Sequence, residues 1–423
     1  MPHEPSPNDP GSETPPSPDP ATAAALDALL ATEEVEATVE RLRSGNERTL
    51  ADQAELTAIP APPFGEEVRG RRMAELMTEA GLGGVRTDAE GNVLGWYGAP
   101  GPGPLVVAAH LDTVFPEGTD VTVTRRGRRL AAPGISDDGR GLAALLAVAR
   151  ALAAGPLALR RPLLFVATVG EEGVGDLRGV RHLFGPEGAG RDAWAFVSLD
   201  GAGIRRIIVQ AVGSWRVRAT VTGPGGHSWV DWGRANPLQA LSAGIARCQD
   251  VPLPPATTFS VGRMGGGTSI NAIPAGAWAE IEVRSTDPEA RAEVVRAVSA
   301  ALAGAVDQAN ARRRSGTDPL ELDVALLGDR PAGGTDPGQP LVRAAVAATW
   351  ASGNAPVYSA SSTDANVPMS LGIPAVTLGA GGTAEGIHTL EEWYDDRGGV
   401  EGLVRALLTL VTYDELAGGP PGA

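Results

Sequence analysis

Five short stretches of this chain end in side chains of the types that can bind metal ions, and this arrangement strongly limits the folds available to it. In an open α/β sheet, ligands gather at the carboxyl ends of the strands, so we expect the five stretches to meet at one edge. Imidazole and carboxylate groups together suit zinc, manganese or cobalt, and the set is too large for a single ion. The stretches are LVVAAHLD with His110 and Asp112, GISDDG with Asp137 and Asp138, VATVGEEG with Glu171 and Glu172, VSLDG with Asp200, and EGIH with His388.

Apolar runs alternate with helical patterns over most of the 423 residues, a length that favours two domains. This alternation predicts an α/β fold with a mostly parallel sheet and helices on both faces. Near Val212 the pattern changes to the order β-α-β-β-α-β, which predicts a ferredoxin-like α+β domain with an antiparallel sheet. The α/β pattern resumes after Gly328. We therefore predict a catalytic domain over residues 21–212 and 329–423, interrupted by a second domain over residues 213–328.

Composition excludes several classes of partner. The formal net charge of -16 argues against nucleic acids and anionic membranes, because binding phosphate needs a basic face. The single cysteine, Cys248, cannot form an intramolecular disulfide and fits a reducing cytoplasm. No apolar run reaches membrane-spanning length, and the N-terminus lacks the basic start and apolar core of a signal peptide. The proline, serine and acidic residues of segment 1–20 predict a disordered tail.

The first two motifs each allow a structural and a chemical interpretation. His110 on its own would suit a buried core histidine, but a ligating imidazole needs its second nitrogen held, and Asp112 is the candidate partner. Asp137 and Asp138 stand at the predicted start of a helix, where capping explains one carboxylate. A carboxylate has two oxygens and can bridge two cations, and Asp137 is the better placed of the pair to do so.

Glu171 and Glu172 follow a buried strand, and a solvated acidic turn is the alternative to a catalytic role. Neighbouring residues at a strand end face opposite ways, so one glutamate can ligate while the other acts as general base. In the second domain, GGHSW, SINAIP and EVRS supply His227, Asn271 and Arg284. The glycines before His227 leave backbone room for a ligand, and the other two side chains suit a carboxylate or carbonyl. Ordinary surface chemistry explains these three residues equally well.

In this order the motifs resemble those of the peptidase T and aminoacylase group of dinuclear zinc exopeptidases, over nearly the whole chain after the first twenty or so residues. The resemblance implies two zinc ions, for which cobalt or manganese can substitute. Where the family often has DDKGG this chain has DDGRG, a departure that affects no ligand. The roles it implies are His110 and Asp200 on one ion, Glu172 and His388 on the other, Asp137 as the bridge, Asp112 as the residue that orients His110, and Glu171 as the general base.

The resemblance also implies a homodimer formed through the second domain, which acts as a lid. By the same resemblance, His227 reaches the neighbouring subunit's site, and Asn271 and Arg284 bind the carboxylate and backbone of the substrate. Position 200 is aspartate, as in the aminopeptidase-like members, whereas deacylases and carboxypeptidases of the group more often have glutamate. We therefore expect an aminopeptidase, or a di- or tripeptidase, in which Glu171 activates water to cleave short peptides.

Two alternatives stay open at this point. The same machinery would serve an N-acyl-amino-acid amidohydrolase or a carboxypeptidase. A protein of another class, a non-catalytic peptide-binding descendant, would be expected to have damaged ligand positions. All five ligand positions and the candidate base are intact in this chain.

Overall fold

A nine-stranded sheet forms the centre of the first of two units, which runs up to Ala211 and resumes at Gly334. The computed structural model describes residues 16–418, so most of the predicted tail lies outside the described residues. The central pairs β3–β6, β3–β7 and β7–β17 are parallel, whereas β1–β2, β2–β6 and β8–β17 are antiparallel. In spatial order the strands are β1 (Gly83–Thr87), β2 (Val93–Tyr97), β6 (Leu163–Thr168), β3 (Leu105–His110), β7 (Ala195–Leu199), β17 (Ala375–Leu378), β8 (Arg206–Ala211) and β15 (Gly333–Gly334), with β16 (Val357–Ser361) parallel to β8.

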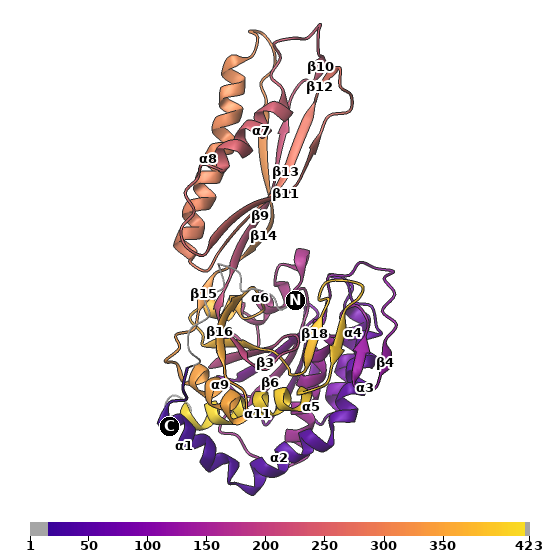
Figure 1. Cartoon of the computed structure of the whole chain (residues 1–423), viewed down its shortest axis with the longest axis vertical. Helices are drawn as coiled ribbons and strands as arrows, with labels where there is room; N and C mark the ends of the chain where they lie inside the picture. Colours follow the sequence, from indigo (N-terminus) through magenta and orange to yellow (C-terminus); the bar gives the residue numbers. More distant parts are fainter. Residues whose placement is uncertain (1–15, 419–423) are drawn as a thin grey trace. The chain divides into compact units, whose positions relative to one another are not determined.

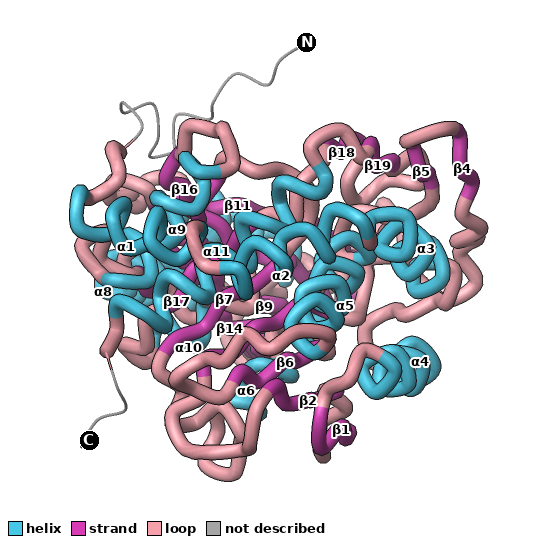
Figure 2. Tube along the Cα trace, turned by 90° about the horizontal axis from the view of Figure 1, so that it is seen from below, coloured by secondary structure: helices cyan, strands magenta, loops and turns pink. Residues whose placement is uncertain are grey.

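Helices cover both faces of this sheet, which confirms the predicted layers (Figures 1 and 2). In β3, Leu105, Val107 and Ala109 pack into the core that contains α5, α9 and α11. The alternate residues Val106 and Ala108 pack into a second core with α6 and α10. Burial on both faces explains why the strand is a continuous apolar run. The bounds are α5 (Gly139–Ala153), α9 (Pro340–Ala351), α11 (Gly399–Leu416), α6 (Arg178–Leu183) and α10 (Asn366–Ser370).

Four helices near the N-terminus and a small second sheet complete the first unit. The helices are α1 (Pro20–Leu30), α2 (Glu33–Ser44), α3 (Asn46–Thr57) and α4 (Glu67–Glu79). The second sheet has the order β18 (Thr383–Glu385), β19 (Trp393–Asp395), β5 (Arg129–Ala131) and β4 (Thr124–Arg126). Its strands are too short to show a period-2 pattern, and the sequence did not predict them. The pairing of β5 with β19 brings the chain before Asp137 next to the chain after His388.

The second unit, Val212–Gly333, is a four-stranded antiparallel sheet with two helices. Its elements follow the chain as β9 (Gly213–Thr222), α7 (Pro237–Cys248), β11 (Thr257–Gly266), β13 (Gly276–Ser285), α8 (Pro288–Arg312) and β14 (Glu321–Arg330). The spatial order β11-β13-β9-β14 agrees with the predicted ferredoxin-like arrangement. A short ladder joins β10 (Gly226–His227) to β12 (Ala272–Ile273). Among residues 16–418, no helix is both long enough and apolar enough to cross a bilayer.

Candidate metal centre

The ends of three parallel strands bring candidate ligands together in the first unit. His110 is the last residue of β3, Asp200 follows β7 directly, and Glu172 lies in the turn after β6. Asp137 comes from the segment before α5, and His388 lies between β18 and β19. Strand ends hold side chains more rigidly than mobile loops do, so His110 and Asp200 have a firm support.

The Asp137 carboxylate lies between two histidines. Its Oδ1 is 2.9 Å from His110 Nε2, and its Oδ2 is 3.1 Å from His388 Nε2. His388 Nε2 is also 3.0 Å from Glu172 Oε1. Each oxygen of Asp137 therefore faces a different imidazole, which is the arrangement that lets one carboxylate serve two neighbouring cation positions.

Two groups of potential ligand atoms share His110. One contains His110, Asp137 and Glu172, the other contains His110, Asp138 and Asp200, and the atoms of each group lie within 4.8 Å of one another. Burial raises the pKa of Asp200 well above its usual value, and the carboxylates of Asp137 and Asp138 raise it further. Crowded, buried carboxylates are costly unless positive charge compensates them, so this donor set fits divalent cations.

The histidines show the same demand for positive charge. Contacts with Asp137 and Glu172 raise the pKa of His388 to about 10. Burial lowers the pKa of His110, but Asp112 and Asp137 outweigh burial and hold that pKa well above its usual value. For the Asp137 carboxylate, burial raises the pKa, but contacts with His110 and His388 lower that pKa by more. The cluster therefore favours a positive charge at each imidazole.

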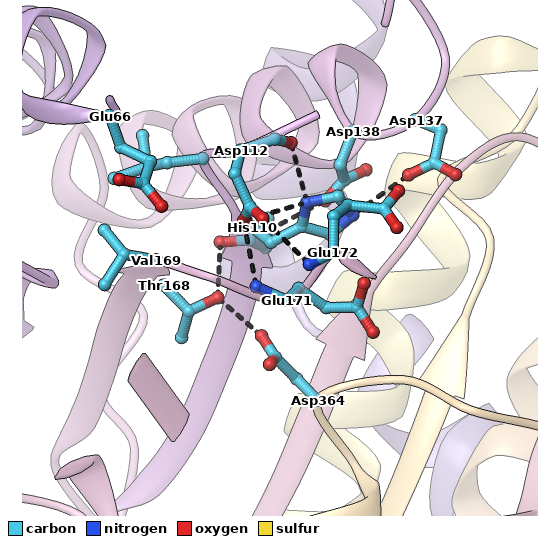
Figure 3. Close-up of polar contacts among 12 residues, drawn as sticks. Glu66, His110, Asp112, Asp137, Asp138, Thr168, Val169, Glu171, Glu172 and Asp364 are labelled. Carbon is cyan, nitrogen blue, oxygen red and sulfur yellow. Dashed lines mark hydrogen bonds and ion pairs between the residues drawn. The ribbon is translucent and has the colours of Figure 1, made fainter. Parts of the chain in front are cut away.

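Asp112 holds two segments of the site together (Figure 3). His110 Nδ1 is 3.0 Å from the Asp112 backbone carbonyl oxygen but 3.7 Å from its Oδ1, so the carbonyl is the hydrogen-bond acceptor. With Nδ1 as donor, Nε2 keeps its lone pair for a metal. The Asp112 carboxylate instead accepts the backbone N–H groups of Glu171 at 3.0 Å and Glu172 at 2.8 Å. It therefore fixes the turn that carries both glutamates.

The two glutamates lie in a turn beyond the end of β6, outside the strand from which their orientation was predicted. In the view of Figure 3, both side chains extend toward the side on which the Asp137 carboxylate lies. The reason is that β6 ends at Thr168, so Glu171 and Glu172 belong to a turn in which period-2 alternation no longer holds. Glu172 contacts His388, while Glu171 is not among the two groups of potential ligands found within residues 16–418.

Asp138 is bound to the backbone and caps a helix. Its Oδ2 accepts the His110 N–H at 3.0 Å, and its Oδ1 accepts the N–H groups of Gly141 at 2.9 Å and Gly201 at 3.1 Å. Asp138 is fully buried and is the N-cap of α5. Capping therefore explains Asp138, whereas the oxygens of Asp137 face the histidines.

This division of roles predicts that substitution of Asp138 mainly affects stability, whereas substitution of Asp137 mainly affects metal binding. Asp138→Asn should lower the free energy of unfolding of the metal-free protein by about 1–3 kcal/mol, because the amide NH₂ group replaces an oxygen that accepts a backbone N–H and leaves that N–H unsatisfied. Asp137→Asn is the matched control and should mainly weaken metal binding. Urea unfolding of both variants, with metal analysis, checks this. A stable Asp138→Asn variant that fails to bind metal would contradict the assignment.

Two buried carboxylates near the site were missed by the sequence analysis. Asp364 is 1% exposed and accepts the Thr168 hydroxyl at the end of β6, at 2.5 Å. Glu392 is 1% exposed and accepts three backbone N–H groups from the segment that carries Asp137. Burial raises the pKa of Glu392 to about 7 despite these three contacts. Neither residue follows a long apolar run, so the signal that found the other carboxylates was absent.

The second unit carries the remaining candidates, and two of them are neighbours. His227 is paired with Ala272 across the β10–β12 ladder, next to Asn271. His227 Nδ1 accepts the backbone N–H of Trp229 at 3.1 Å. The proton of the neutral ring is therefore on Nε2, which can donate to a ligand.

Arg284 is not brought together with this pair. It lies near the far end of β13, opposite Ser214, whereas Gly276 at the other end follows the β10–β12 ladder. At about 3.3 Å per residue, the intervening strand spans roughly 26 Å. Arg284 Nε pairs with Glu282 Oε2 at 2.8 Å. Within this unit, Arg284 therefore belongs to a different location from His227 and Asn271.

Residues 106–413 match the model of peptidase family M20/M25/M40. No curated protein sequence matches the chain. Aminopeptidase PepT from Bacillus cereus ATCC 10987 has a similar structure, with a TM-score of 0.69 and 24% identity over 88% of this chain and 99% of its own. A tripeptidase from Staphylococcus aureus subsp. aureus Mu50 has a TM-score of 0.70 and 22% identity over 88% of this chain and 98% of its own. The dipeptidase Dug1p from Saccharomyces cerevisiae has a TM-score of 0.68 and 15% identity over 90% of this chain and 98% of its own. These similarities are similarities of fold.

Proposed function

Because this chain belongs to peptidase family M20/M25/M40, we propose that it is a two-metal exopeptidase that hydrolyses short peptides, as an aminopeptidase or a di- or tripeptidase. The observation that carries the proposal is the Asp137 carboxylate, whose two oxygens face His110 and His388. A peptide-binding protein without catalysis would have no need for a carboxylate shared between two such positions.

The ligand set proposed for two zinc ions combines imidazole nitrogen and carboxylate oxygen, and cobalt or manganese suits the same donors. His110 and Asp200 would hold one ion, Glu172 and His388 would hold the other, and Asp137 would bridge them. Ions bound there would lower the pKa of a shared water and polarise the carbonyl of the scissile bond. The contacts that support this assignment are those of Asp137 with His110 and His388, the contact of Glu172 with His388, and the group that brings Asp200 close to His110.

In this proposal Glu171 moves the proton. Its carboxylate accepts a proton from the attacking water, whose oxygen then bonds to the scissile carbonyl carbon. Glu171 returns that proton to the nitrogen of the leaving amine as the carbon–nitrogen bond breaks. Asp112 supports both roles of the turn, because its carboxylate holds the N–H groups of Glu171 and Glu172.

We further propose that the second domain acts as a lid and forms a homodimer, with His227 reaching the neighbouring subunit's site. The hydrogen bond from Trp229 N–H to Nδ1 supports this role, because it leaves Nε2–H free to donate to an oxyanion. Asn271, which adjoins His227, and Arg284 would bind the backbone and carboxylate of the substrate. The distance of Arg284 from the other two along β13 means that these contacts would be made at separate points.

A peptide panel tests the proposed activity. Metal-free protein is loaded with zinc, cobalt or manganese and given di- and tripeptides with free or acetylated amino termini, with free or amidated carboxyl termini, and N-acetylated amino acids. We expect kcat/KM for free amino termini to exceed that for acetylated ones by at least about 100-fold. Preference for N-acetylated amino acids would establish an amidohydrolase, and dependence on the free carboxylate alone a carboxypeptidase. No hydrolysis with any metal would favour a non-catalytic protein.

A further inference from the structure

A buried carboxylate outside the proposed ligand set joins the loop of Asp137 to the loop of His388. Glu392 Oε1 accepts the backbone N–H groups of Ser136 at 2.8 Å and Asp137 at 3.1 Å. Its Oε2 accepts the N–H of Gly134 at 2.8 Å. Both oxygens are therefore occupied by the segment that presents Asp137, while Glu392 itself follows His388 in the chain.

The backbone around Glu392 makes the same connection. Its carbonyl oxygen accepts the N–H of Ala132 at 3.2 Å, and the next residues form β19, which pairs with β5. The segment between β5 and α5 has no strand or helix that orients Asp137. The same holds for the segment between β18 and β19, which contains His388. Three hydrogen bonds to one buried carboxylate therefore support the segment of Asp137 and tie it to the chain that follows His388.

We propose that Glu392 is a positioning residue of the metal centre, which sets the separation of Asp137 and His388. This inference rests on the proposed function, because it presupposes metal ions at these residues. Glu392 is absent from both groups of potential ligands found among the described residues 16–418, so its contribution is indirect. Metal sites tolerate errors of only about 0.5 Å in ligand placement. Loosening one loop should therefore lower the affinity for the ion that Asp137, Glu172 and His388 would hold.

Glu392→Gln tests this with little change in size. The amide keeps one acceptor oxygen but turns an NH₂ group toward a backbone N–H, so one loop contact becomes repulsive. We expect the affinity for one of the two metal ions to fall by about 10–100-fold, with the other within about threefold of wild type. Glu391→Gln is the matched control, because Glu391 is the exposed neighbour in the same loop. It should bind both ions as wild type does.

The measurement is calorimetric titration of metal-free protein with Co²⁺, combined with the visible absorption spectrum of the bound ions. The cobalt spectrum reports ligand geometry, which a purely structural loss of stability would leave unchanged for the folded fraction. At saturating cobalt, kcat of Glu392→Gln should return to within about threefold of wild type. Circular dichroism of the metal-free variants shows whether they fold.

The outcomes separate this inference from the proposed function. Wild-type protein that binds no metal would refute the proposed function itself. Wild-type protein that binds two ions, with Glu392→Gln unchanged in both affinities and in its spectrum, would overturn the positioning role alone. Glu392→Asp serves as a second variant, and its shorter side chain should give an intermediate affinity. If neither variant folds without metal, Glu392 acts in global stability and the inference is wrong.

Discussion

Replacement of Glu171 by glutamine should lower kcat by about 10³–10⁴-fold while both metal ions stay bound. An amide cannot accept the proton of the attacking water, so the step assigned to Glu171 loses its base. The support of the turn should survive, because Asp112 contacts the Glu171 backbone N–H rather than its side chain. The measurement is kcat on the best peptide of the panel, with metal content determined on the same sample.

Glu172→Gln is the control for that experiment. Glu172 Oε1 lies 3.0 Å from His388 Nε2, so this variant should lose metal as well as activity. Glu171→Gln with wild-type kcat, or with its metal content reduced to that of the Glu172 variant, would remove the general-base assignment and leave the fold and family unaffected.

Removal of the metal ions should abolish peptide hydrolysis and lower the thermal stability of the protein. Without cations, no metal ion compensates the buried carboxylates: burial raises the pKa of Asp200, and repulsion by Asp137 and Asp138 raises it further. A ligand at 1,000 times its Kd stabilises a protein by about 4 kcal/mol, which we expect to appear as a fall in Tm of about 5–10 °C on chelation.

Dialysis against EDTA, followed by thermal unfolding and peptide assays, checks this expectation. Adding zinc back should restore both Tm and activity. The Asp137→Asn variant provides the control, because zinc should shift its Tm far less. Full hydrolysis after the metal content has fallen well below one ion per chain would show that the bond is cleaved without this centre.

Much of the fold could be predicted because long buried strands have recognisable apolar patterns in the sequence. The run from Leu105 to His110 is apolar throughout, and the structure buries its side chains in two cores on opposite faces of the sheet. The change of pattern after Val212 likewise reflects a sheet with helices on one side, whose strands alternate between core and exterior. In both cases the signal is local periodicity, which survives without knowledge of the tertiary contacts.

The contacts that shape the site are less visible in the sequence, because they depend on distant pairing. Strands of three residues, such as β5 and β19, carry no periodicity, and only their pairing brings Glu392 to the Asp137 segment. In isolation, Glu391 and Glu392 look like a solvated acidic turn, although one is exposed and the other buried. Arg284 is a second example. The motif that contains it predicts a substrate contact, but the motif does not show that Arg284 lies far along β13 from His227 and Asn271.

The point at which the chain leaves and re-enters the first unit has a consequence for how such proteins diversify. Strand β8 ends at Ala211, β15 lies beside it in the sheet, and the N–H of Thr335 donates to the Val209 carbonyl at 2.9 Å. The intervening 212–333 segment thus begins and ends at adjacent strands. Because lengthening a closed loop adds little entropy cost, a longer or shorter insertion at this position would leave the pairing of β8 with β15 unchanged.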